Sequence, residues 1–251
     1  MGIGKYFTKT VKPTMLAAKM DSGAYSADDV LFDWFAFTVP KGTSMLRGVT
    51  ALVRGNDGAA QAIAFDVLFA RATDGTSDAA VATAPSSIGT EHATANGTGY
   101  YNELLGVVSF AAADYGQNSL DNMSVATAHA TPPAFALTGL PEDKPNVGYD
   151  TLYVAGVAGG AFNFASTVAL TGAHDADDSN DLTVDTKDAR LVLAPGDVII
   201  AQDEAAIGTI GSIPDATSVI LANGASNSAA LANNDELYNQ SPITLILTLE
   251  R

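Results

Sequence analysis

The sequence predicts an all-β protein, an antiparallel β-sandwich of jelly-roll type that carries a small inserted β-barrel. Apolar runs rich in Val, Leu, Ile, Thr and Phe recur along the 251 residues, and clusters of Gly, Pro, Asn and Asp separate them. About eight longer runs suit one antiparallel sandwich, and a set of shorter runs in the last third suits a small barrel. The chain is long enough to bury its core without disulfides, and it has no Cys to form them.

The first three strands are expected within residues 30–72, which read VLFDWFAFTVPKGTSMLRGVTALVRGNDGAAQAIAFDVLFARA. Apolar runs at 31–39, 45–53 and 62–70 are separated by Pro-Lys-Gly and Gly-Asn-Asp-Gly, which interrupt a strand pattern. Consecutive runs of this kind predict a meander of three neighbouring strands. The first run is apolar on both faces and holds the only Trp of the chain, Trp34, so we expect it in the middle of the core.

The middle of the chain supplies further strands of the sandwich. Residues 73–99 are rich in Thr, Ala, Gly and Ser and predict a long loop. A strand or strand pair is expected at 100–112, and an extended segment, broken by a Pro-Pro pair, is expected at 125–137. Residues 149–170 predict two strands joined at a Gly-Gly turn.

The last third predicts a separate small barrel within residues 173–240. It opens with the acidic segment DADDSND, which we interpret as a linker. Short apolar runs then follow at 190–193, 197–201, 207–210 and 218–221, with tight turns between them. Strands this short, joined by turns this tight, favour a small closed sheet.

The chain ends on the apolar segment PITLILTLE, in which every second residue from 243 to 249 is Ile or Leu. A strand this apolar has to lie inside a sheet. We therefore expect it to return to the sandwich, beside 162–170 or beside the opening meander. Residues 30–172 plus 241–251 then form the jelly-roll-like sandwich, and 173–240 form the inserted barrel.

Residues 1–29 are expected to form an N-terminal arm that binds a partner. The first nineteen residues hold four of the twelve basic side chains and no acidic one, whereas the whole chain has a net charge of −16. Aromatic side chains lie among these lysines, so the segment combines positive charge with apolar surface. The alternative is a tail that packs on its own domain. The predicted partner-binding residues are Lys5, Tyr6, Phe7, Lys9, Lys12 and Lys19.

The sequence predicts no enzyme chemistry: no catalytic residues, no cofactor and no metal site. It contains no serine-nucleophile, zinc-protease, phosphate-loop or dinucleotide motif, and its three His residues lie far apart. The segment DADDSND lacks the glycine and the closing glutamate of a calcium loop, so a solvated linker is favoured over an ion site. Four carboxylates are weak candidates for a glycoside-hydrolysing pair: Glu91, Glu103, Glu142 and Asp150.

Composition also narrows the class of partner. An acidic surface repels nucleic acid, and no segment approaches the roughly 20 apolar residues that span a bilayer. The N-terminus has no apolar core of a signal peptide. We therefore expect a protein partner, with no nucleic acid and no membrane. Apolar residues on both faces of several strands exceed what one thin sandwich hides, which predicts a homotrimer.

Two stretches, VLFDWFAFTVPKGTSMLRGVTALVRG and GDVIIAQDEAAIGTIGSIPDATSVILANG, resemble virion structural proteins of tailed, marine bacteriophages, which are acidic and cysteine-free. The functional type they resemble is the head decoration, or cement, protein. The resemblance implies a non-enzymatic, trimeric jelly-roll or sandwich protein, made in the host cytoplasm and seated on the outer capsid surface, which it braces. Its partner is then the major capsid protein or another virion protein. One alternative is a tail, neck or receptor-binding component of the virion; another is a carbohydrate-binding or carbohydrate-active β-sandwich.

Overall fold

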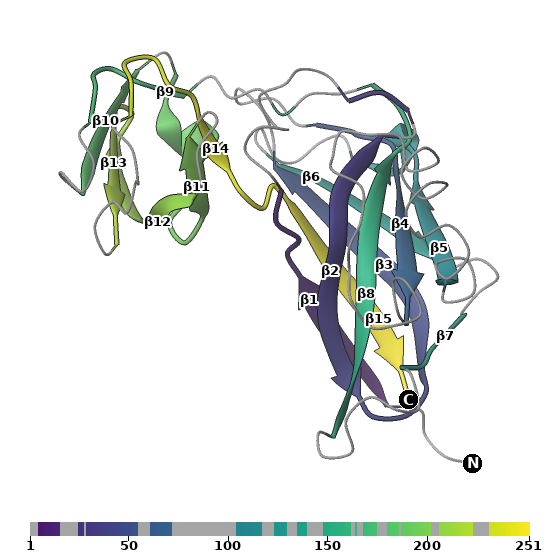
Figure 1. The fold of residues 1–251 in the computed structure, drawn as a ribbon. Helices are drawn as coiled ribbons and strands as arrows, with labels where there is room; N and C mark the ends of the chain where they lie inside the picture. Colours follow the sequence, from purple (N-terminus) through teal and green to yellow (C-terminus); the bar gives the residue numbers. More distant parts are fainter. Residues whose placement is uncertain are drawn as a thin grey trace, which may run out of the picture.

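The structure is a computed structural model that describes residues 5–15, 25–27, 29–54, 61–71, 104–116, 123–129, 135–139, 148–161, 164, 168–174, 180–185, 187–201, 206–222 and 231–251. Within these residues the chain is all-β, and every strand pairing is antiparallel. Two single 3₁₀ turns, Ala112–Asp114 and Ala189–Leu191, are the only helical segments in these ranges. The strands form two sheets of a sandwich and a third sheet that curls into a small barrel (Figure 1).

The first sheet of the sandwich has the strand order β1-β15-β3-β6, and β7 pairs with β3 beyond the end of β6. Its centre is the C-terminal strand, which pairs with β1 on one side and β3 on the other. The prediction that this strand returns to the opening strands of the sandwich is confirmed. The strands are β1 (Tyr6–Val11), β15 (Ile243–Glu250), β3 (Ser44–Arg54), β6 (Met123–His129) and β7 (Phe135–Leu137).

The second sheet has the order β2-β8-β4-β5 and faces the first. β8 is the central strand, with β2 on one side and β4 on the other. The strands are β2 (Val30–Pro40), β8 (Tyr149–Ala158), β4 (Phe65–Ala70) and β5 (Leu104–Phe110).

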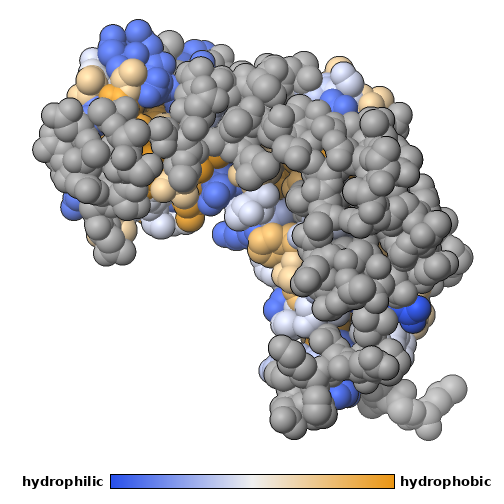
Figure 2. All heavy atoms as spheres, viewed as in Figure 1, coloured by the Kyte–Doolittle hydropathy of each residue, from blue (hydrophilic) through white to orange (hydrophobic). Residues whose placement is uncertain are grey.

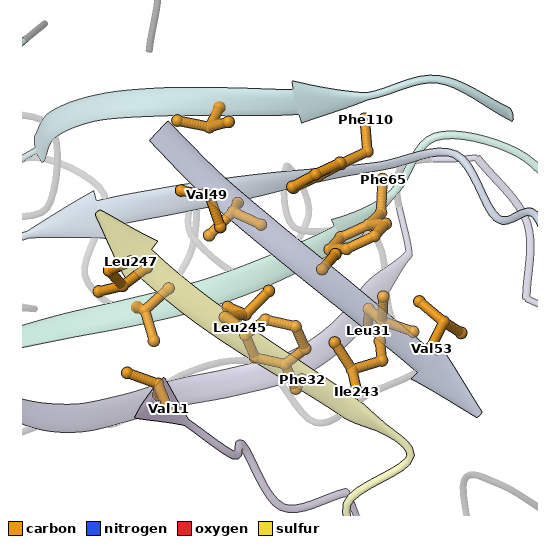
Figure 3. Close-up of a cluster of buried hydrophobic side chains, with 14 of the residues drawn as sticks. Val11, Leu31, Phe32, Val49, Val53, Phe65, Phe110, Ile243, Leu245 and Leu247 are labelled. Atoms are coloured by element: carbon orange, nitrogen blue, oxygen red, sulfur yellow. The ribbon is translucent and has the colours of Figure 1, made fainter. Parts of the chain in front are cut away.

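The main core lies between these two sheets, where side chains from both meet (Figure 3). β15 buries every second residue along its length, because a strand alternates its side chains between two faces. Phe65 of β4 stacks on Phe110 of β5, with ring centroids 4.9 Å apart. A Cβ at Gly156 of β8 would come within 2.3 Å of the Phe32 ring, so glycine is what allows β2 to pack this ring across its neighbour.

The three opening strands do not form the meander that the sequence predicts. β3 lies in the first sheet, whereas β2 and β4 lie in the second, where β8 separates them. Each connection therefore carries the chain from one sheet to the other. The places beside β2 and β3 are taken by β8 and β15, which come from far along the chain. Strand pairing here depends on long-range contacts that a local pattern does not contain.

Trp34 lies outside the main core, contrary to the prediction. It is buried in a small separate cluster with Ala70 and Ala155, whereas Phe32 belongs to the main cluster. The register of β2 against β8 shifts between Phe32 and Phe35, and such an irregularity changes which side chains share a face. Both faces of β2 are therefore apolar, as the sequence indicated, and Trp34 lies on the face that does not contribute to the main core.

The barrel sheet has the order β14-β11-β12-β13-β10-β9. It is nearly closed, because Ala169 bridges Glu236 and the Leu237 N–H donates to the Val168 carbonyl at 2.9 Å. Its buried core contains only Val, Leu, Ile and Ala side chains. The strands are β9 (Ala169–Leu170), β10 (Asp181–Asp185), β11 (Val198–Ala201), β12 (Ala206–Asp215), β13 (Ser218–Leu221) and β14 (Leu237–Asn239).

The barrel sheet begins earlier in the chain than predicted. Leu170 of β9 pairs with β10 and is buried in the barrel core, so the end of the predicted hairpin at 149–170 belongs to the barrel instead. The predicted strand at 190–193 contains a 3₁₀ turn instead, whose N-cap residue Asp188 accepts the Arg190 N–H at 3.0 Å. The loop predicted at 73–99, the Pro-Pro pair and most of DADDSND lie outside the described residues.

The barrel contacts one end of the sandwich and projects from it (Figure 2). Arg54, the last residue of β3, donates from Nη2 to both carboxylate oxygens of Asp197, at 3.1 and 3.2 Å. Tyr238 and Ile200 of the barrel strands belong to the core cluster of the sandwich. This joint therefore combines an ion pair with apolar packing.

Candidate functional site: a basic edge strand

Part of the segment predicted as an N-terminal arm is a strand of the sandwich. β1 pairs with β15 along its whole length, and Lys5 exchanges two backbone hydrogen bonds with Arg251, at 3.2 and 3.1 Å. Val11 and Met15 are buried in the main core (Figure 3 labels Val11). Residues 5–15 therefore pack on their own domain, which was the alternative to a partner-binding arm. The cause is the alternation of Phe7, Lys9 and Val11 with threonines, which gives β1 one buried face.

A groove lies between β1 and β2, the end strands of the two sheets. Residues 9–12 and 35–38 line a hollow of about 400 Å³ that is open to solvent. Lys9 reaches across it, and its Nζ donates to Thr38 Oγ1 at 3.4 Å, which is a long and therefore weak hydrogen bond. Lys12 is exposed at the same groove, and Phe35 and Phe37 supply its apolar side. The hollow thus brings Lys9 and Lys12 together with the partly buried Phe35.

The predicted partner-binding residues have different surroundings in the structure. Lys9 and Lys12 meet at the groove, and Tyr6 is 64% exposed on the outward face of β1. Phe7 packs against the main core, so it is partly a structural residue. Lys5 is exposed at the opposite end of the strand. Lys19 lies outside the described residues.

Two further cations lie at the Lys5 end of β1, and sequence analysis did not single them out. Arg251 pairs with Lys5 through the backbone, and its Nη2 donates to the Lys41 carbonyl at 2.8 Å. Arg47 is close by in β3, but its charge is already paired with Glu250. The available signal was the apolar C-terminal strand: pairing it with β1 would have placed Arg251 beside Lys5.

No second chemistry is assembled in the described part of the chain. No group of three or more potential metal ligands is found there. Among the four candidate carboxylates only Asp150 is described; it is 5% exposed and accepts the Gly42 backbone N–H at 3.0 Å. Gly42 has φ +103°, a conformation that favours glycine, so Asp150 fixes the turn after β2. This is a structural role for the carboxylate.

Comparison with known proteins assigns the chain to no family. No protein-family model matches the sequence, and no curated protein matches it either. Within the described residues, no helix has the length and apolar character needed to cross a membrane. The basic edge strand β1 and its groove are therefore the features on which a function has to be argued.

Proposed function

We propose that the protein is a non-enzymatic virion structural protein, a head decoration or cement protein that binds the outer surface of a capsid and stabilises it. Its partner is then the major capsid protein or another virion protein. The observation that carries the proposal is the gathering of basic side chains along one open edge of a strongly acidic molecule. That arrangement suits attachment to an acidic protein surface.

The strand order supports a jelly roll as the sandwich type. The sandwich has eight strands besides the short β7. When these eight are numbered in chain order, one sheet reads 1-8-3-6 and the other reads 2-7-4-5. This order places successive strands alternately in the two sheets over most of the chain, as in a fold of two Greek keys. Jelly rolls recur in viral capsid and lectin domains, so the fold supports a virion role and the carbohydrate-binding alternative equally.

The distribution of charge favours the virion role over the alternative. Residues 173–240 hold twelve of the 28 acidic residues and two of the twelve basic ones, a net charge of −10. The other basic residues lie outside this segment. Lys9 lies in the edge strand β1, and Lys5 and Lys12 are the residues that flank it. Long-range attraction to an acidic protein surface would steer the molecule so that β1 faces the partner.

The direct test is to measure the amount of this protein in purified virus particles. A decoration protein copurifies in amounts comparable with the major capsid protein, whereas a tail, neck or receptor-binding component is present in far fewer copies. Absence from particles, together with retention on a carbohydrate matrix, would favour the sugar-binding alternative. Light scattering at micromolar concentration tests the proposed homotrimer in solution. A protein that is a monomer in solution and also a monomer on the particle would exclude the trimer.

The attachment surface is tested by charge reversal rather than by truncation. Deleting residues 1–20 removes β1 from its sheet and Val11 from the core, so a loss of binding would not separate attachment from folding. The variant Lys9→Glu/Lys12→Glu keeps the strand. We expect it to lose binding to particles stripped of the protein, while Lys187→Glu in the barrel binds as before. Equal binding by both variants would refute attachment through β1.

A further inference from the structure

We propose that β1 binds an extended, acidic segment of the partner protein as an additional strand of its sheet. The inference rests on the proposed function, because it specifies how the same basic edge recognises its partner. It follows from two features of β1, the direction of its backbone groups and the chemistry of the groove beside it. It also follows from the fact that no other end strand in the described part of the chain is basic.

The backbone of β1 has a row of hydrogen-bonding groups that point away from β15. In an antiparallel pair, hydrogen-bonded residues alternate with residues whose N–H and C=O face outward. Lys5 is hydrogen-bonded in both directions to Arg251, so the odd-numbered residues of β1 face β15. The N–H and C=O groups of Tyr6, Thr8 and Thr10 therefore face the outer edge, where no strand of the described residues pairs with them. An exposed row of this kind is a template for a further strand.

The side chains beside this edge select for charge. A strand added next to β1 places alternate side chains over the groove, near Lys9 and Lys12 and against Phe35. Opposite charges on neighbouring strands stabilise their pairing, and like charges destabilise it. Acidic side chains at the groove-facing positions of the added strand would pair with Lys9 and Lys12 and lie beside Phe35, and its other side chains would face away from the groove. The same lysines disfavour pairing between two copies of β1, which would bring like charges together.

The other edges of the structure lack this combination. The end strands β5 and β7 contain no charged residue, β6 contains only His129, and the one charged residue of β2 is an aspartate. The barrel leaves little open edge, because β9 and β14 are joined by a bridge and by backbone hydrogen bonds. β1 is therefore the single basic end strand in the described residues.

Hydrogen exchange of the β1 amides tests the register of the proposed pairing. In the full-length protein alone, the amides of Phe7, Lys9 and Val11 should exchange slowly, and those of Tyr6, Thr8 and Thr10 quickly. The probe is a short peptide of alternating valine and glutamate, and the control is a valine–lysine peptide of equal length. We expect the valine–glutamate peptide to slow exchange at Tyr6, Thr8 and Thr10 at low salt and to bind about tenfold more tightly than the control, the effect of two exposed ion pairs. The difference should vanish near about 1 M salt, where the screening length is about 3 Å.

Two comparisons make the test decisive. Lys9→Glu/Lys12→Glu should reverse the preference between the two peptides, and Lys187→Glu should leave it unchanged. Binding without slower exchange at Tyr6, Thr8 and Thr10, or equal binding of both peptides, would overturn strand addition. If the protein nevertheless attaches to particles through the lysines, the proposed function stands and only the mode of recognition is refuted. If the peptides behave as expected but particles are not bound, strand addition at β1 stands and the proposed function is refuted.

Discussion

The sandwich and the barrel bury their strands in different ways. The sandwich uses strands of up to eleven residues and an aromatic core, in which Phe65 stacks on Phe110 and Phe37 meets Phe69 edge to face. The barrel uses strands of two to ten residues and an aliphatic core. A small closed sheet has a narrow interior, and aliphatic side chains fill it without the volume of a Phe ring.

The two regions also differ in what they leave open. The barrel nearly closes its sheet, so it has little edge to offer a partner, and its segment carries a net charge of −10. The sandwich keeps open end strands, and one of them, β1, is basic. Closure and charge together indicate a division of roles. Under the proposed function, the sandwich would provide the contact surface, and the acidic barrel would project from it and repel non-specific association.

The largest expected effect comes from core truncations that separate the two cores. Phe65→Ala removes a fully buried ring from the sandwich and should lower its free energy of unfolding by about 3–5 kcal/mol. Leu182→Ala removes a buried side chain from the barrel and should cost about 2–5 kcal/mol there. If the cores are separate, each variant shifts only the urea unfolding transition of its own core. Hydrogen exchange in β4 monitors the sandwich, and hydrogen exchange in β10 monitors the barrel. A single transition that both variants shift equally would show one cooperative unit.

A smaller effect is expected when the whole barrel is replaced by a short Gly/Ser linker. The chain enters and leaves the barrel at neighbouring points, because the Leu237 N–H donates to the Val168 carbonyl. A short linker can therefore replace residues 168–240, and loop closure adds little cost. We expect a folded sandwich that is about 3 kcal/mol less stable, since Tyr238 and Ile200 no longer cover its core. Loss of cooperative melting would mean that the sandwich depends on the barrel to fold.

Sequence reasoning recovered the strands better than their partners. The apolar runs at 31–39 and 45–53 correspond to β2 and β3 within one residue at either end, because alternation and turn residues are local signals. The meander was wrong because pairing depends on β8 and β15, which are distant in sequence. The placement of Trp34 failed for a related reason: a register irregularity in β2 changes the face that a residue occupies without altering the composition of the strand.

The candidate site could be located from the sequence only in part. The excess of lysine in the first nineteen residues was visible, and it indicated a basic surface, where the structure places Lys9 and Lys12. The groove was not, because Phe35 and Phe37 come from the other sheet of the sandwich, and only the fold brings β2 beside β1. The strand pattern of residues 6–11 is too short and too weakly apolar to distinguish an edge strand from an arm until the partner strand β15 is known.

A modest effect is expected at the joint between the two regions. Arg54→Ala removes the ion pair with Asp197, whose side chains are 31% and 13% exposed, and should cost about 0.5–1 kcal/mol. Its main consequence is geometric, since this polar contact helps to fix the angle of the barrel. Small-angle scattering should show a broader range of shapes for the variant than for the parent. Arg47→Ala, which breaks the ion pair with Glu250 inside the sandwich, is the matched control and should leave the shape unchanged.

The smallest effect concerns Tyr115, which packs at the edge of the sandwich core. Its hydroxyl is buried and forms no hydrogen bond with the described residues, so Tyr115→Phe should change stability by less than about 1 kcal/mol at neutral pH. Burial, and to a lesser degree the nearby Asp114, raises the pKa of Tyr115 well above its usual value of 10.0. Tyr25 has its pKa raised in the same direction, by burial and then by Asp29.

These two tyrosines give the sandwich a sensitivity to alkaline pH. Because the folded-state pKa is raised, the associated stability is complete below the unfolded pKa of about 10 and is lost as the pH rises toward the folded pKa. Each group then lowers the free energy of unfolding by up to about 1.4 kcal/mol per pH unit. Tyr115→Phe should therefore flatten the fall in stability measured by urea unfolding above pH 10, without abolishing it, because Tyr25 remains. Tyr149→Phe, at a side chain that is 55% exposed, is the control and should leave the slope as it is. An unchanged slope in Tyr115→Phe would show that this hydroxyl reaches solvent before the sandwich unfolds.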